Sequence, residues 1–232
     1  MQLSDNFKNI RKVAVIDDNR IACEAMAEVV EDANLEPMPY QGRLESINDF
    51  IPRVMEETDA AIFDHRLKPG NYADFDGAEA VSHLYKKKFP ALLVTTYFKA
   101  EIDAFRLYRR DIPVLIPADK ANSEKIIEGI KKCLDEFSYN YSKDRRAWRT
   151  LIRIEEIDKD VGIAFAYIPA WNPDEVVRIP LKLIPEELLA KEPIFRLFAY
   201  VNIGAKNYED LYFEKFEIAD KPRGKYARLL HS

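Results

Sequence analysis

Short apolar runs alternate with amphipathic segments from Val13 to about Phe137. The five runs cover residues 13–16, 37–40, 60–63, 91–94 and 114–116. Between the runs, apolar residues recur at spacings of three and four, clearly over 21–30 and 126–137 and more weakly over 43–57, 77–88 and 99–109. This spacing places apolar side chains on one face of a helix. The pattern predicts five βα units that form a parallel sheet with helices on both faces.

The second apolar run differs from the others because it contains Pro37 and Pro39. Proline cannot donate a hydrogen bond to a neighbouring strand, so this run is expected at the edge of the sheet. The runs at 13–16, 60–63 and 91–94 are almost continuously apolar, as strands buried on both faces should be.

The pattern changes after residue 137. Residues 138–147 are mostly polar and have no clear period, which is typical of a linker or helix extension. From residue 148 onward, apolar residues alternate with polar ones in segments near 150–154, 163–167, 176–179, 195–203 and 211–218. Alternation of this kind predicts β-strands, and Pro185 to Lys191 is the one helical stretch among them. We therefore expect a first domain over 1–137 and a small, barrel-like β-rich domain over 148–232.

Composition narrows the classes of protein. The 232 residues are 47% hydrophobic and 32% charged, which fits a globular chain and excludes a disordered one. The net charge of −5 argues against binding polyanions over the whole surface. Residues 1–144 carry 20 basic and 26 acidic side chains, whereas 145–232 carry 15 and 14. With two cysteines and no signal peptide or membrane span in the sequence, we expect a cytoplasmic protein with reduced thiols.

Polar residues stand at the ends of the predicted strands. The first run is followed by Asp17 and Asp18, the third by Asp64, the fourth by Thr95 and Thr96, and the fifth by Lys120. Because the carboxyl ends of parallel strands share one edge, these side chains are expected to converge. Two carboxylates in close contact repel by roughly 4 kcal/mol at an effective dielectric constant of about 20. A hard divalent cation such as Mg²⁺ would offset that repulsion.

The same residues carry a resemblance to a known family. The motifs are Val-Ile-Asp17-Asp18-Asn, Ile-Phe-Asp64, Asp76-Gly77, Val-Thr95-Thr96 and Asp-Lys120. In type and spacing they resemble the receiver domain of two-component response regulators, over more than half of the chain. The resemblance implies a flavodoxin-like, doubly wound sheet of five parallel strands. It also implies that a histidine kinase or a phosphotransfer protein donates a phosphoryl group to Asp64.

The resemblance further implies a role for each site residue. Asp17, Asp18, Asp64 and the backbone carbonyl of Arg66 would hold Mg²⁺. Thr95, or Thr96 if the register differs by one residue, would bond a phosphoryl oxygen, and Lys120 would pair with another. A receiver catalyses only its own phosphorylation and dephosphorylation, so the chain is not expected to be an enzyme acting on other substrates. Many receivers pair through their fourth-helix face, and a two-fold homodimer would follow from such pairing.

The sequence departs from the family pattern at several positions. Pro117 stands where receivers usually carry an aromatic switch residue, and Ala121 replaces the usual proline after the lysine. Thr96 is larger than the residue preferred there, and the connection from Asp64 to Gly77 is longer than usual. These departures keep a second interpretation open, in which the chain is a scaffold with a receiver fold that is never phosphorylated.

The β-rich half lacks the signals of the common outputs. It has no pair of long amphipathic helices for a helix-turn-helix domain, and its only histidine is His231. We therefore expect it to bind another protein or to mediate self-association. The alternative is a DNA-binding transcription regulator with a LytR-like β-rich output, suggested weakly by 195–202. The many aromatic residues of this half could stack on bases, but alternation favours a role in a barrel core. In the first half, His65 and His83 are expected to be structural or surface residues.

Overall fold

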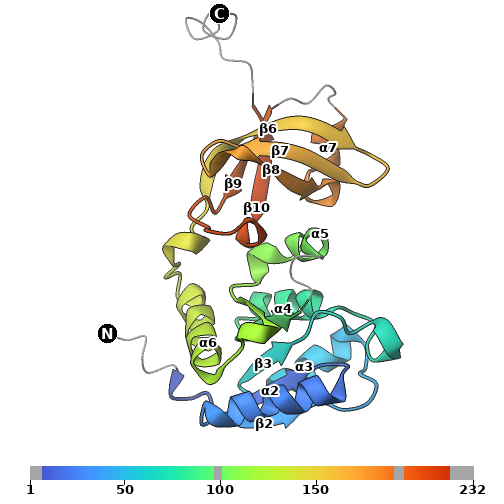
Figure 1. The fold of residues 1–232 in the computed structure, drawn as a ribbon, viewed down its shortest axis with the longest axis vertical. Coiled ribbons are helices and arrows are strands. Elements are labelled where there is room, and N and C mark those ends of the chain that lie inside the picture. Colours follow the sequence, from blue (N-terminus) through green and yellow to red (C-terminus); the bar gives the residue numbers. More distant parts are fainter. Residues whose placement is uncertain (1–6, 97–100, 191–195, 220–232) are drawn as a thin grey trace, which may run out of the picture. The chain divides into compact units, whose positions relative to one another are not determined.

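The computed structural model describes residues 7–96, 101–190 and 196–219. The chain divides into two compact units, residues 1–145 and residues 146–232, which are described separately (Figure 1). The residues predicted as a linker, 138–147, fall mainly in the first unit, where Lys143–Arg145 form a 3₁₀ turn. None of the helices in the described ranges is both long and apolar enough to span a membrane.

The first unit is built on five parallel strands. In chain order its elements are β1 (Lys12–Ile16), α2 (Arg20–Asp32), β2 (Glu36–Pro39), α3 (Ile47–Glu57), β3 (Ala60–Phe63), α4 (Gly77–Lys86), β4 (Ala91–Thr95), α5 (Ile102–Arg106), β5 (Leu115–Pro117) and α6 (Ser123–Phe137). The strand order is β2-β1-β3-β4-β5, which confirms the flavodoxin-like, doubly wound sheet and the edge position of β2. The chain reverses direction across the sheet between β1 and β3, the point where such folds place their ligands.

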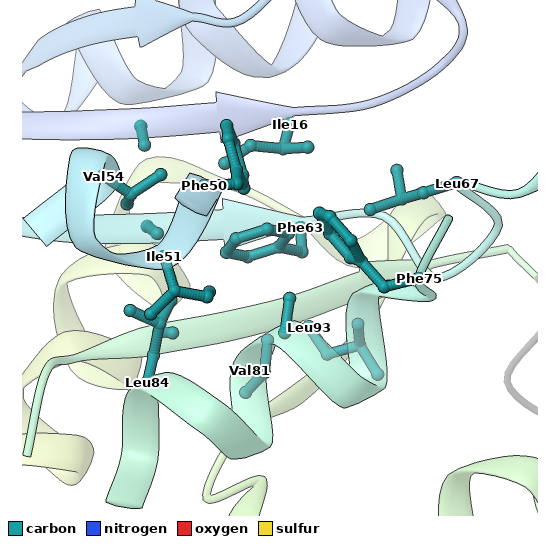
Figure 2. Close-up of a cluster of buried hydrophobic side chains, with 14 of the residues drawn as sticks. Ile16, Phe50, Ile51, Val54, Phe63, Leu67, Phe75, Val81, Leu84 and Leu93 are labelled. Atoms are coloured by element: carbon teal, nitrogen blue, oxygen red, sulfur yellow. The ribbon is translucent and has the colours of Figure 1, made fainter. Parts of the chain in front are cut away.

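Two apolar layers cover the sheet. One lies under α2 and α6, where both cysteines, Cys23 and Cys133, are buried as free thiols. The other lies under α3 and α4, and Figure 2 shows it around Phe50, Phe63 and Phe75. The Phe50 ring stacks on Phe75 at a centroid distance of 5.8 Å. Because Phe75 belongs to the long connection after β3, that connection is held in the core.

The last residue of the first unit is a buried cation. Arg145 donates from Nε to Glu136 Oε1 at 2.7 Å, and both side chains are almost fully buried. Its remaining nitrogens donate to the carbonyl oxygens of Arg109 at 3.1 Å and Arg110 at 2.6 Å. A buried guanidinium needs this full set of acceptors, so Arg145 ties the chain after α6 to the segment between α5 and β5.

The second unit is an antiparallel sheet. Its elements are β6 (Trp148–Asp158), β7 (Ile163–Ile168), β8 (Asn172–Pro180), α7 (Glu186–Leu189), β9 (Arg196–Val201) and β10 (Phe213–Ile218), and the strand order is β10-β9-β6-β7-β8. The long strand β6 pairs with β9 through its first half and with β7 through its second half, with an irregularity between Ile154 and Glu156. The predicted residues Lys191 and Phe195 lie outside the described ranges.

One face of this sheet encloses a single apolar core. All five strands contribute buried residues to it, with Leu188 of α7 completing the cluster. The amide of Arg178, on edge strand β8, donates to the hydroxyl of Tyr208, which precedes the other edge strand, at 3.0 Å. The two ends of the sheet are therefore brought around one core, in keeping with the predicted β-rich, barrel-like domain.

The aromatic residues of this unit divide between the two faces, which the prediction of a common core did not foresee. Phe213 and Phe216 are buried in the core. In contrast, Phe165 and Tyr167 of β7, with Phe198 and Tyr200 of β9, are half-buried on the opposite face. The inward positions between them are filled by the small residues Ala164, Ala166 and Ala199. The alternation correctly predicted the strands, but it places these four rings on the face opposite the core.

Candidate functional site

Three carboxylates meet at the carboxyl edge of the parallel sheet. Asp17 and Asp18 follow the last residue of β1, and Asp64 follows the last residue of β3. One oxygen atom from each lies within 4.8 Å of the others. The Asp64 amide donates to the carbonyl of Ile16 at 2.8 Å, which extends the pairing of β1 and β3 up to the cluster. The three predicted acids are thus brought together by strand pairing.

The residue after the acids fixes their connection to α2. Asn19 caps the helix, because its side-chain oxygen accepts hydrogen bonds from the amides of Ile21 at 3.0 Å and Ala22 at 3.2 Å. Its own amide donates to Asp17 Oδ1 at 2.8 Å. One asparagine therefore starts the helix and orients the first carboxylate.

The pKa values of Asp17 and Asp18 are raised. Burial is the main reason that the pKa of Asp17 rises to about 6, and the charges of Asp64 and Asp18 add to that rise. The pKa of Asp18 is also raised, by burial first and then by Asp64. The negative charge of Asp64 therefore raises the pKa of both other acids. A cation bound among these oxygens would remove the repulsion, and three carboxylates are a donor set that suits Mg²⁺.

A glycine allows the backbone of Asp64 to be packed closely. A Cβ atom on Gly77 would overlap the carbonyl oxygen of Asp64, so no larger residue fits at the start of α4 without displacing it. The Gly77 amide donates to the carbonyl of His65 at 2.9 Å. The Asp64 side chain is held as well, because its Oδ2 accepts from the amide of Arg66 at 2.8 Å. This close approach explains in steric terms why the Asp76-Gly77 motif has glycine at its second position.

The acids border a cavity of about 530 Å³. Its polar wall includes Asp17, Asp18, Asp64 and Thr96, and its apolar wall includes Ile62, Val94 and Met26. Thr96 therefore borders the site in this structure. Thr95 is fully buried within β4 and does not line the cavity.

The predicted lysine is not among the residues that line the cavity beside the acids. Lys120 is exposed at the end of a 3₁₀ turn, Ala118–Lys120, that separates it from β5. It does not line the cavity, and within the described ranges it forms no ion pair. Its backbone carbonyl accepts from Nζ of Lys125 at 2.7 Å. The turn lies between Pro117 and Ala121, two of the positions at which the sequence departs from the family pattern.

Glu101 is a site neighbour that the sequence did not indicate. Its carboxylate accepts from Arg66 Nε at 2.6 Å and lies 3.2 Å from His65 Nε2. Burial lowers the pKa of His65, whose ring packs edge-on against Phe105 at 4.4 Å. His65 is therefore neutral near pH 7 and structural, in line with the prediction. No local spacing could reveal this contact, because 35 residues separate Arg66 from Glu101.

The long connection after β3 adds a second wall beside the acids. The hydroxyl of Tyr72 donates to the carbonyl of Tyr40 at 2.8 Å, and the Leu44 amide donates to the carbonyl of Tyr72 at 2.7 Å. A hollow of about 420 Å³ lies between this connection and the acids, and Arg20 and Arg43 contribute to its lining. The extra residues thus shape the approach to the site.

Comparisons with known proteins concern the first unit. No protein-family model matches the sequence, and no curated protein matches it significantly. Solved structures similar to this part of the chain include a response regulator receiver domain protein from Clostridium thermocellum, at 12% identity and a TM-score of 0.42, covering 56% of this chain and 98% of that one. A receiver domain protein from Methanospirillum hungatei has 20% identity and a TM-score of 0.41, with the same coverage. The N-terminal domain of a three-domain response regulator from Carboxydothermus hydrogenoformans has 13% identity and a TM-score of 0.42.

Proposed function

We propose that this chain is a two-component response regulator in which Asp64 accepts a phosphoryl group from a histidine kinase or a phosphotransfer protein. The observation that carries the proposal is the meeting of Asp17, Asp18 and Asp64 within 4.8 Å at the switch point of a flavodoxin-like sheet. The strand order and the site geometry of this chain support it independently of the low identities to solved structures.

Asp64 is the best-placed acceptor of the three acids. It is the one acid of the three that follows β3, the strand next to β1 in the centre of the sheet, and one of its oxygens lies within 4.8 Å of an oxygen of each other acid. Its backbone is fixed by β1 and by the close approach of Gly77. In the proposed step, a carboxylate oxygen of Asp64 attacks phosphorus, the P–N bond to the donor imidazole breaks, and that nitrogen retains the bonding electron pair.

Asp17, Asp18, Asp64 and the backbone carbonyl of Arg66 would hold Mg²⁺, which neutralises charge on the transferring phosphoryl group when bound. The protein's own contribution is to fix the three carboxylates before the donor arrives. Without the cation they repel one another and the approaching phosphoryl group, so labelling should require Mg²⁺.

Two further side chains, a threonine hydroxyl and the Lys120 ammonium, would contact the phosphoryl oxygens. Thr96 borders the cavity, so we assign the phosphoryl-oxygen contact to Thr96, with Thr95 as the alternative. Lys120 would pair with another phosphoryl oxygen only after its exposed side chain turns toward the site. A lower labelling rate in Lys120→Ala, with the acceptor unchanged, would support this assignment.

The test is covalent labelling of the full chain by phosphoramidate, read by intact mass with and without Mg²⁺. The expected result is one phosphoryl adduct that requires Mg²⁺ and is absent from Asp64→Ala. Asp74→Ala is the matched control, because Asp74 is an exposed acid of the same connection. If the wild type stays unlabelled while a known receiver is labelled, the chain is a scaffold with a receiver fold.

A further inference from the structure

The solvent-facing side of the antiparallel sheet pairs every half-buried ring with a cation. The guanidinium carbon of Arg153 lies 4.7 Å from the ring centre of Tyr167, and that of Arg149 lies 3.8 Å from Phe198. The same arrangement joins Arg178 to Phe165 at 5.6 Å and Lys215 to Tyr200 at 5.4 Å. We call these eight residues the aromatic–cation face. It covers all five strands.

Two arginines on this side of the sheet face each other without an acid between them. Arg153 of β6 is directly opposite Arg196 of β9, and both are exposed. Like charges opposed across a ladder are destabilising. Within the described ranges neither forms an ion pair. An anion bound between them would relieve the repulsion, just as a cation would relieve the acid cluster of the first unit.

Acids also lie on this side of the sheet, on edge strand β10 and near the end of β6. Glu217 pairs with Arg149 at 2.9 Å and is thereby neutralised. Glu214 is opposite Tyr200, and Glu156 is opposite Phe165. None of these acids is directly opposite Arg153 or Arg196 in the strand register, and Tyr167 adjoins Arg153 on its other side.

We propose that the aromatic–cation face, with Arg196, binds single-stranded nucleic acid. Guanidinium groups beside the rings can donate hydrogen bonds to phosphate oxygens, and the exposed parts of the rings offer surfaces on which unpaired bases stack. A duplex keeps its bases stacked internally and offers only its phosphates.

This partner differs from the protein partner expected from the sequence. An acidic protein surface would satisfy the arginines but would gain nothing specific from four regularly spaced rings. The two partners also differ in what they predict, because an acidic polypeptide should compete with single-stranded nucleic acid only if charge alone determines binding.

The experiment measures fluorescence anisotropy of a labelled oligothymidylate of roughly 20 nucleotides with the full chain, over a range of salt concentrations. The arginine variant is Arg153→Gln with Arg196→Gln. It should bind roughly tenfold or more weakly, and its salt slope should fall by about 1.4, the value for two lost phosphate contacts on a single strand. Lys206→Gln, which changes an exposed lysine of the same unit outside this face, should bind as the wild type does.

The stacking variant is Tyr167→Leu, which keeps an apolar side chain and changes no charge. It should weaken binding by roughly fivefold or more, since stacking of one base is worth at least that much. Circular dichroism establishes that each variant is folded. The proposal is overturned if the wild type does not bind at low salt, if the arginine variant binds unchanged, or if polyglutamate or duplex DNA competes as well as single strands. None of these outcomes depends on whether Asp64 is phosphorylated.

Discussion

The two sheets of this chain have five strands each and leave opposite parts of themselves available for chemistry. The parallel sheet is covered on both faces by apolar layers, so its polar residues are confined to the carboxyl edge, where Asp17 and Asp64 follow buried strands. The antiparallel sheet encloses its core with one face only, and alternate residues of every strand remain on the other. Polar residues available for ligand binding therefore lie at the edge of the parallel sheet and on the open face of the antiparallel sheet.

The two candidate sites are also electrostatic opposites. In the first unit three carboxylates converge, whereas in the second Arg153 faces Arg196. Each arrangement is unfavourable by itself and would be stabilised by a ligand of opposite charge. Like charges without a compensating partner therefore point to a ligand more directly than paired charges, because the fold itself explains a paired charge.

The largest predicted effect concerns a compensated pair. Glu136→Ala leaves Arg145 buried without its carboxylate, and should lower the free energy of unfolding of the first unit by about 3–5 kcal/mol. By contrast, Glu217→Ala removes the half-exposed partner of Arg149 and should cost no more than about 1 kcal/mol. Urea denaturation of both variants checks the difference. Equal losses would show that burial does not determine the cost of removing the carboxylate from an ion pair.

A steric effect of intermediate size is expected at the acid cluster. Gly77→Ala places a Cβ against the carbonyl oxygen of Asp64 and should cost about 1–3 kcal/mol through overpacking. Because the displaced backbone carries the acceptor, Mg²⁺-dependent labelling should fall as well. Ala78→Gly, at the next position of α4, is a control that removes a methyl group from the helix instead of adding one. Full labelling of Gly77→Ala would show that the close approach is dispensable.

A pH effect follows from the acids themselves. The pKa of Asp17 rises from 3.8 to about 6 on folding, so the folded chain binds the extra proton and loses stability as the pH rises through that interval. Discounted for solvent screening, the loss should be about 1–2 kcal/mol. Asp17→Asn should flatten this part of the stability profile when Mg²⁺ is absent. A profile as steep as that of the wild type would mean that the cluster is not strained.

The smallest predicted effect involves His65, whose pKa is lowered mainly by burial. Its contribution to stability is present above its ordinary pKa and is lost as the pH falls below that value and the ring must take up a proton. The favourable charges of Asp76, Glu101 and Asp64 reduce the loss. Thermal unfolding of His65→Phe, followed from neutral to mildly acidic pH, should therefore differ in slope only slightly from the wild type.

Sequence patterns predict the first unit well because strand burial and strand ends are local properties. Continuous apolar runs indicated the buried strands, Pro37 and Pro39 indicated the edge, and the residues after the strands indicated Asp17, Asp18 and Asp64. Contacts between residues far apart in the sequence could not be predicted from these local patterns. Glu101 and Arg145 meet their partners only through the tertiary fold.

In the second unit, period two predicts strands but not which side is inward. Apolar and aromatic residues alternate with alanine, so both sides of β7 look apolar in the sequence. Only the packing shows that Ala164 and Ala166 face the core, while Phe165 and Tyr167 lie outside. Likewise, the turn before Lys120 depends on the path of the chain after β5 and cannot be inferred from the Asp-Lys motif alone.

The most direct test of the central claim is the location of the phosphoryl group. After labelling with phosphoramidate and Mg²⁺, borohydride reduces an aspartyl phosphate to homoserine, and peptide mass spectrometry identifies the converted residue. We expect conversion at position 64, with positions 17 and 18 unchanged. Conversion at Asp17 or Asp18, or a stable adduct on a histidine, would contradict the assignment of Asp64 as the acceptor.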